Sequence, residues 1–194
     1  MKIVAIVGSP RPRGNTNYLV DQALAEADKL GVETEKIILS QYTVNPCQGH
    51  DNCASQPECL QKDDAPWILE KFRQADGIIL ATPVYYFYMT AQMKAFVDRH
   101  YFLYMHDIGI EAKVGGLIVV AGGEGMEHTE RWMRRFLAYC IGNNDRITTV
   151  IGLANRLGEM KKNASAIEEA RKLGRLMASQ LMQDTPAPST GSSQ

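Results

Sequence analysis

Short apolar runs alternate with longer amphipathic segments along most of this chain. The short runs carry apolar residues at consecutive positions, which is typical of strands that are buried on both faces of a parallel sheet. The longer segments repeat apolar residues at the spacing of a helix that buries one face. The alternation therefore predicts an α/β domain with helices on both faces of a parallel sheet.

The same pattern predicts where each element lies, to within about 2 to 4 residues. The expected strands are residues 2–7, 33–39, 77–81, 114–121 and 148–152. The expected helices are residues 16–30, 66–74, 90–104, 127–141 and 165–183. Residues 40–64 are polar, carry cysteines and are long for a connection within a compact domain, so we expect them to have a function. We expect one domain over residues 1–184 and a disordered tail over residues 185–194.

Size and charge narrow the classes of function. A chain of 194 residues with 45% apolar composition suits a single packed domain. Lysine and arginine number 21 against 22 aspartates and glutamates, so no net field attracts nucleic acid or anionic lipid. No apolar run approaches the roughly 18 residues that span a bilayer, and an apolar strand follows Lys2 with no room for a signal peptide. We expect a cytoplasmic protein with no nucleic acid and no membrane partner.

The loop after the first strand, residues 8–17, is a candidate phosphate site. Its sequence is GSPRPRGNTN, and it leads into a helix whose free amides and hydroxyls from Ser9 and Thr16 can hold a phosphate dianion. It lacks the lysine of a nucleoside triphosphate loop and does not match the dinucleotide pattern G-x-G-x-x-G. A monophosphate is therefore favoured. The alternative is an ordinary turn between strand and helix, capped by Asn15 or Thr16.

Two further loops have the composition of a site for a flat ring. Residues 82–89, TPVYYFYM, place a proline and four aromatic residues where a connection is normally polar, and such walls suit an isoalloxazine ring. For Phe87 and Tyr88, a place in the core or in a subunit contact is favoured over ring contact. Residues 122–125, GGEG, let the backbone approach a planar ligand closely.

Sheet topology brings these three loops together. In the doubly wound strand order 2-1-3-4-5, strands 1, 3 and 4 are neighbours, so the loops after them flank one crevice at the carboxyl edge of the sheet. A monophosphate cradle beside aromatic and glycine walls predicts a site for flavin mononucleotide (FMN).

The motifs resemble the family of NADPH-dependent FMN reductases and iron-sulfur flavoproteins. The resemblance covers residues 1–152 and is carried, in chain order, by residues 8–11 with 14–16, by 63–64, by 75–79 and 82–86, and by 94–99. It implies a flavodoxin-like fold, bound FMN, and a homodimer or homotetramer in which a neighbouring subunit helps to cover the flavin. Aromatic segments 85–88 and 101–105 are the expected subunit contacts.

The resemblance also implies a set of site residues. Phosphate contacts fall on Ser9, Arg11, Thr16 and Asn17, and Asn15 of the same loop joins the candidate cofactor-binding residues. Ring contacts fall on Pro83, Val84, Tyr85 and Tyr86, with Gly122 and Gly123 closing the site. The resemblance assigns a site role to Arg99 less directly. The alternative role of Arg99 is an ion pair with an exposed carboxylate.

The cysteine loop departs from the family pattern. Iron-sulfur flavoproteins resemble this chain in carrying C-x-x-C-x-x-C-x(4 to 7)-C there, whereas the series here is Cys47, His50, Cys53 and Cys59. One interpretation is a [4Fe-4S] cluster with His50 as fourth ligand and a raised potential, because neutral imidazole leaves the site less negative than thiolate does. A second is zinc held by three cysteines and one histidine. A third is no metal, with the loop serving as a contact surface.

Other candidate groups are expected to be structural. Cys140 lies in a helix pattern among apolar residues, so a buried place in the core is expected. The remaining histidines, His100, His106 and His128, form no recognised ligand spacing and are expected on the surface.

These expectations lead to an FMN-dependent oxidoreductase that takes hydride from NAD(P)H and passes electrons to a small-molecule or protein acceptor. The reaction chemistry belongs to the flavin, so no catalytic dyad is required, and none is found. One alternative is a ferredoxin-linked electron-transfer iron-sulfur flavoprotein. Another is a non-catalytic flavin or metal module, because fold alone does not prove activity.

Overall fold

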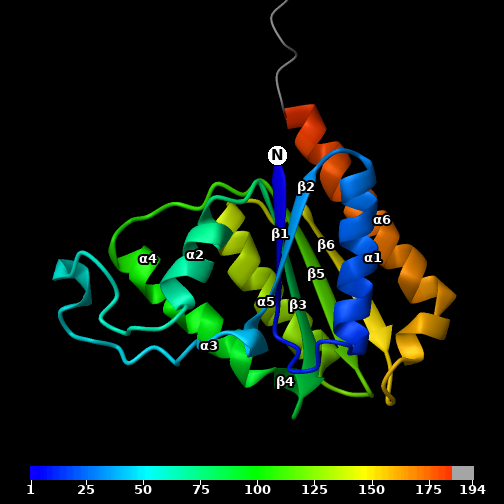
Figure 1. The fold of residues 1–194 in the computed structure, drawn as a ribbon, viewed down its shortest axis with the longest axis horizontal. Coiled ribbons are helices and arrows are strands. Elements are labelled where there is room, and N and C mark those ends of the chain that lie inside the picture. Colours follow the sequence, from blue (N-terminus) through cyan, green and yellow to red (C-terminus); the bar gives the residue numbers. More distant parts are fainter. Residues whose placement is uncertain (185–194) are drawn as a thin grey trace, which may run out of the picture.

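The structure is a computed structural model that describes residues 1–184, and the predicted disordered tail, residues 185–194, lies outside the described residues. Its centre is a parallel sheet in the order β2-β1-β3-β5-β6 (Figure 1). The strands along this path are Glu33–Ile38 (β2), Lys2–Val7 (β1), Gly77–Tyr85 (β3), Val114–Ala121 (β5) and Ile147–Leu153 (β6). With the short β4 set aside, this is the doubly wound order 2-1-3-4-5, which confirms the predicted fold class.

Helices cover both faces of the sheet (Figure 1). One face carries α1 (Asn15–Lys29) and α6 (Ala164–Asp184). The other carries α2 (Ala65–Arg73), α3 (Ala91–Arg99) and α5 (Met126–Ile141), with the short α4 (Tyr101–Met105) following α3. Three 3-10 turns complete the path: Leu39–Gln41 (η1), Cys53–Ser55 (η2) and Glu159–Lys162 (η3).

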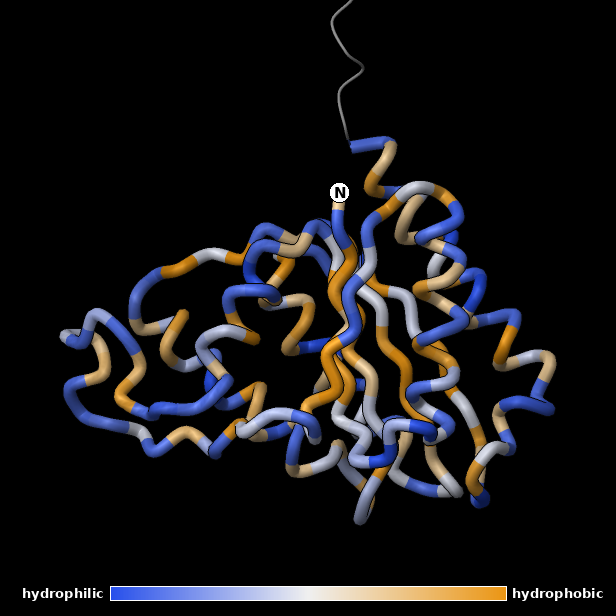
Figure 2. Tube along the Cα trace, viewed as in Figure 1, coloured by the Kyte–Doolittle hydropathy of each residue, from blue (hydrophilic) through white to orange (hydrophobic). Residues whose placement is uncertain are grey.

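Burial explains why the strands were recognisable in the sequence. Every residue of β5 is buried, and every residue of β1 after Lys2 is buried, because helices close both faces of the central strands. Figure 2 shows these strands as the most hydrophobic part of the chain, between helices that mix polar and apolar positions. The edge strand β6 differs, since Ile151 and Leu153 are 43% and 59% exposed.

The third strand is longer than the sequence predicted. We expected it to end at Ala81, but β3 continues to Tyr85 and pairs antiparallel with β4 (Tyr88–Met89). The expected open aromatic loop is therefore a hairpin. Its two turn residues, Tyr86 and Phe87, have φ angles of +48° and +67°. Two successive positive φ angles define a type I′ turn, which ordinarily takes asparagine and glycine.

The single helix expected over residues 90–104 is two helices that meet at His100. The ring of His100 lies at 3.1 Å from the Phe96 carbonyl, and its backbone amide bonds instead to the Val97 carbonyl. A carbonyl can only accept a hydrogen bond, so Nδ1 of His100 carries the proton and donates it to the Phe96 carbonyl. In a regular helix the backbone amide of His100 would donate to this carbonyl instead. The helix therefore tightens and breaks at this residue.

The expectation that His100 lies on the surface is wrong. The residue is 8% exposed, and its ring meets the rings of Phe72, Phe96 and Phe136 at centroid distances of 4.7 to 4.8 Å. Burial lowers its pKa from 6.5 to about 4, against the opposing effect of the backbone hydrogen bonds.

Cys140 packs against the same core cluster as expected, although it is not fully buried, and burial raises the pKa of its thiol to about 12.

Within residues 1–184, no helix combines the length and the apolar character needed to cross a bilayer.

Candidate functional site

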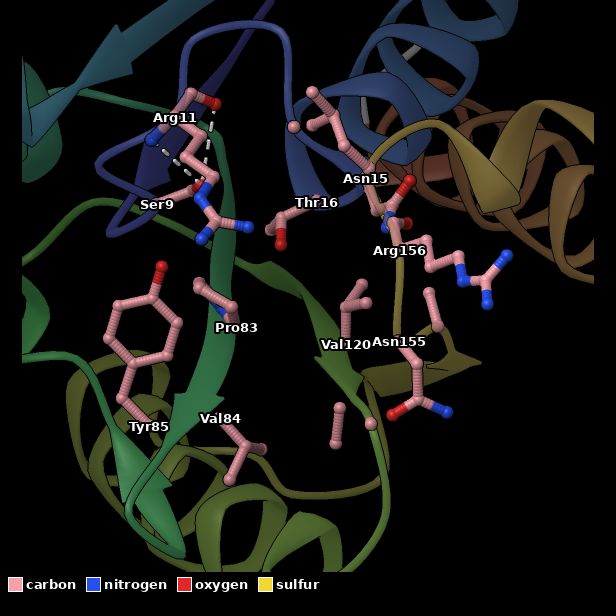
Figure 3. Close-up of a pocket in the computed structure, with 15 residues that line it drawn as sticks. Ser9, Arg11, Asn15, Thr16, Pro83, Val84, Tyr85, Val120, Asn155 and Arg156 are labelled. Atoms are coloured by element: carbon pink, nitrogen blue, oxygen red, sulfur yellow. Dashed lines mark hydrogen bonds between the residues drawn. The ribbon is translucent and has the colours of Figure 1, made fainter.

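A cavity of about 200 Å³ opens at the carboxyl edge of the sheet, where β1, β3, β5 and β6 end (Figure 3). It is lined by Ser9, Arg11, Gly14, Asn15, Thr16, Pro83, Val84, Tyr85, Val120, Ala121, Gly122, Ala154, Asn155, Arg156 and Leu157. The three loops singled out in the sequence therefore border one site, as the strand order requires.

The first loop presents unpaired backbone donors to this cavity. Helix α1 begins after Gly14 without a side-chain cap, and the amides of Asn15, Thr16 and Asn17 donate to no other described residue. The Thr16 hydroxyl likewise has no partner among the described residues, and it faces the cavity in Figure 3. Such a helix start favours a bound anion, because free N–H groups and the helix dipole act together.

Gly14 makes this cradle possible. A Cβ placed on Gly14 would lie 2.9 Å from the Arg11 carbonyl oxygen and 3.3 Å from the Ser9 hydroxyl, so a side chain here would force the loop apart. The Gly14 amide donates to that same carbonyl at 2.8 Å and closes the loop tightly.

Ser9 and Arg11 complete the loop. The Ser9 hydroxyl accepts from the Arg11 amide at 3.3 Å, and Ser9 itself is 3% exposed. In Figure 3 the Arg11 guanidinium points into the space between Thr16 and Pro83. A positive charge, free amides and a hydroxyl thus converge, which is the donor set of a phosphate monoester site.

Asn17 does not line the cavity. It is fully buried beneath the loop, where its Nδ2 donates to the Arg11 carbonyl at 3.1 Å, and its Oδ1 has no partner among the described residues. The side chain of Asn15 is also engaged elsewhere, since it bonds to Arg156 and Met160. Asn15 therefore offers the cavity a backbone amide rather than a free side chain, and Asn17 supports the loop from beneath.

The loop after β6 also lines the cavity, although its residues were not predicted from the sequence. Ala154, Asn155, Arg156 and Leu157 line the cavity. Figure 3 shows Asn155 and Arg156 on the side opposite Tyr85. The available signal was topological, because β6 also ends at this edge of the sheet, next to β5. Its composition alone does not distinguish it from an ordinary loop.

The residues of the hairpin and of the glycine loop line two different hollows. Pro83, Val84 and Tyr85 line the cavity together with Gly122, whereas Tyr86 is 97% exposed and does not line it. Gly123 belongs to an adjoining hollow of about 490 Å³ that is lined by Phe87 and residues 123–128. The structure thus brings together most of the predicted ring contacts but leaves Tyr86 and Gly123 outside the cavity.

These residues fit FMN. The start of α1 offers unpaired donors to a phosphate group, and the adjoining wall of Pro83, Val84 and Tyr85 is apolar and aromatic, with the exposed Gly122 beside it. The donors lie at one end and the flat wall at the other, as a flavin nucleotide requires.

The four candidate metal ligands lie in the segment that projects from the left of Figure 1, beside α4. Cys47, His50, Cys53 and Cys59 border one small cavity together with Arg99. Burial raises the pKa of Cys53, and the neighbouring sulfurs of Cys59 and Cys47 add to the effect. Within residues 1–184, no three such side chains converge closely enough to hold a single metal ion.

Arg99 lies at the base of this loop and not in the flavin cavity. Its ion-pair partner is Asp63 at 2.6 Å, and the two side chains are 1% and 0% exposed. Arg99 therefore forms an ion pair, as its alternative role required. The predicted exposure of the partner carboxylate is wrong, because Asp63 is buried.

Comparison with known proteins agrees with the fold and the cavity. Residues 1–144 match the NADPH-dependent FMN reductase family. The chain is 37% identical over 186 residues to an iron-sulfur flavoprotein of Methanocaldococcus jannaschii, covering 92% of this chain and 96% of that one. A second iron-sulfur flavoprotein, from Methanosarcina thermophila, is 37% identical over 74% of this chain and 78% of its own length.

Among solved structures, an FMN-dependent NADH-azoreductase from Bacillus anthracis in complex with FMN shares the fold. Its TM-score is 0.63 at 16% identity, over 93% of this chain and 99% of that chain.

The fold and the cavity define a flavin-binding oxidoreductase of the flavodoxin-like class. The chain belongs to the NADPH-dependent FMN reductase family. It is an FMN-dependent oxidoreductase, and FMN is its cofactor, as the sequence predicted.

Proposed function

We propose that this protein takes hydride from NAD(P)H and passes the electrons to a second acceptor. The observation that carries this proposal is the cavity itself, where an unpaired helix start and an aromatic wall meet at one sheet edge. The family to which the chain belongs supports a nicotinamide donor. FMN, when bound, supplies the hydride and electron chemistry.

We propose separate tasks for the residues of the cavity. The amides of Asn15, Thr16 and Asn17, with the Thr16 hydroxyl and the Arg11 guanidinium, hold the phosphate. Pro83, Val84, Tyr85 and Gly122 position the ring, and Asn155 closes the opposite side. No protein side chain needs to transfer a proton in this scheme, because the hydride and electron chemistry would belong to the flavin.

The adjoining hollow beside Phe87 is the place that we propose for the pyridine nucleotide. It shares the hairpin and the glycine loop with the flavin cavity, and Gly125 lets the two segments touch. A Cβ on Gly125 would lie 2.5 Å from the Phe87 Cα, so the hairpin tip rests directly on this loop. The hairpin tip and the glycine loop that line this hollow are therefore packed against each other next to the proposed ring site.

Anaerobic mixing with NADPH or NADH tests the donor. We expect either nucleotide to bleach the flavin absorbance, in amounts equivalent to the bound FMN. A protein that holds FMN but reacts with neither nucleotide contradicts the donor step and leaves FMN binding intact.

A second candidate function, electron transfer through an iron-sulfur centre, is supported by two observations. Relatives at 37% identity are named iron-sulfur flavoproteins. In this chain Cys47, His50, Cys53 and Cys59 border one cavity, and their sulfur and imidazole donors suit iron or zinc. We propose that they hold a [4Fe-4S] cluster, which would give one-electron capacity beside the flavin.

Metal analysis decides this candidate. We expect iron and acid-labile sulfide in protein purified without oxygen, and reduction by ferredoxin. Zinc without sulfide would favour the alternative metal, and neither iron nor zinc would leave the loop as a contact surface. The homodimer or homotetramer, its aromatic contacts and the cytoplasmic location stay predictions.

A further inference from the structure

A single buried side chain, that of Arg99, holds the cysteine loop at three points. Its Nη1 donates to the Asp63 carboxylate at 2.6 Å and to the Asn45 carbonyl at 3.2 Å. Its Nη2 donates to the Cys59 sulfur at 3.2 Å. The two ends of the loop and its last cysteine are therefore tied to the end of α3.

Asp63 fixes the direction of this guanidinium. Its carboxylate also accepts the amides of Asn45 at 2.9 Å and Ala65 at 3.1 Å. Burial alone would raise the pKa of Asp63, but the hydrogen bonds from Arg99 and these amides hold it below its usual value. The carboxylate stays charged and paired, which leaves the second guanidinium nitrogen for Cys59.

The helix that carries Arg99 is anchored at its other end to the flavin cavity. Thr90 caps α3 by accepting the Met93 amide at 3.3 Å, and its hydroxyl donates to the Gly8 carbonyl at 2.7 Å. Gly8 begins the phosphate loop. Helix α3 therefore joins the support of that loop to the support of the cysteine loop.

From these contacts we infer that Arg99 is a positioning residue for the metal centre proposed above: it fixes the Cys59 sulfur and raises the reduction potential of the bound centre. A hydrogen bond to a ligating sulfur draws negative charge away from the centre, and the reduced state carries more of that charge. His50 acts in the same direction, because imidazole is neutral where the family pattern has a thiolate. The inference rests on the proposed metal centre but not on the nicotinamide step.

The test compares the wild type, Arg99→Lys and Arg134→Lys, each purified without oxygen. Lysine keeps the charge at position 99 but loses the fork that reaches Asp63 and Cys59 together. Arg134 is a matched control, because it pairs with Glu130 at 2.6 Å and bonds no cysteine. The readouts are iron, sulfide and FMN per chain, and the potential of the centre from a redox titration followed by electron paramagnetic resonance.

We expect Arg99→Lys to lower the potential by about 60 mV, a tenfold change in the equilibrium constant of a one-electron couple. Lower iron content with full FMN in this variant also supports the inference, while Arg134→Lys stays at wild-type values. An unchanged potential with full iron overturns the inference, as does loss of FMN together with iron. Wild-type protein that holds FMN but no iron overturns the inference too and leaves the oxidoreductase function standing.

Discussion

The side chain of Asn15 joins the first loop of the flavin cavity to the last. Its Nδ2 donates to the Arg156 carbonyl at 2.8 Å, across 141 positions of sequence. Its Oδ1 accepts the Met160 amide at 3.3 Å. One amide group thus closes the cavity between the start of α1 and the segment that leads into α6.

Asn15→Ala should loosen this closure. We expect FMN to bind about tenfold more weakly, because two hydrogen bonds worth about 1 kcal/mol each are lost and part of that loss falls on the bound state. The change should fall mainly on the dissociation rate, measured by the recovery of flavin fluorescence. Asn144→Ala is the control, since Asn144 is exposed at the opposite end of β6. Equal dissociation rates in both variants would argue against the closure.

Thr16→Val tests the anion cradle. The hydroxyl is lost while the shape of the side chain is kept, so we expect FMN affinity to fall about tenfold to a hundredfold, the range for hydrogen bonds to charged groups. Calorimetric titration of apoprotein measures this. Thr34→Val on the outer strand β2 should leave affinity unchanged. If Thr16→Val also binds FMN like the wild type, the hydroxyl does not contact the phosphate.

The fold was predictable from the sequence because burial acts residue by residue along the central strands. β1 and β5 are apolar at consecutive positions since helices cover both of their faces, and their predicted bounds agree with the structure. The strand order then placed Ser9, Thr16 and Gly122 at one edge without any knowledge of side-chain contacts.

The structural features that could not be predicted from the sequence depend on contacts between distant segments. The side chain of Asn15 faces Arg156 only because β6 returns to the same edge of the sheet. His100 resembles a surface histidine in sequence, yet three phenylalanines from three helices enclose it. The hairpin turn at Tyr86 and Phe87 carries none of the usual turn residues, so no local sequence pattern predicted it.

That turn should store strain. Tyr86 and Phe87 both adopt left-handed backbone, which costs a non-glycine residue about 1 kcal/mol or more. The double substitution Tyr86→Asn with Phe87→Gly supplies the residues that a type I′ turn prefers. It should raise the free energy of unfolding of the apoprotein by about 1 kcal/mol, measured by urea denaturation. A less stable double variant would show that packing of the aromatic rings outweighs the backbone strain.

His100 should make stability depend on pH in a defined window. Its pKa is lowered from 6.5 to about 4 in the folded state, so below pH 6.5 the unfolded chain takes up a proton that the folded chain does not. Stability contributed by the neutral ring is therefore lost as pH falls from 6.5 to 4, by about 3 kcal/mol at most, at about 1.4 kcal/mol per pKa unit. The unfolding free energy of His100→Phe should fall less steeply across this window. Parallel pH profiles for the two proteins would contradict the burial of a neutral imidazole.

We expect the cavity to recognise FMN by its phosphate. Equilibrium titration of the apoprotein with FMN and with riboflavin isolates this contribution, because the two ligands share the ring and differ in the phosphate. We predict one FMN per chain and at least about a hundredfold weaker binding of riboflavin, given the charge-assisted hydrogen bonds available at the start of α1. Equal affinity for the two flavins would show that the start of α1 does not bind the phosphate.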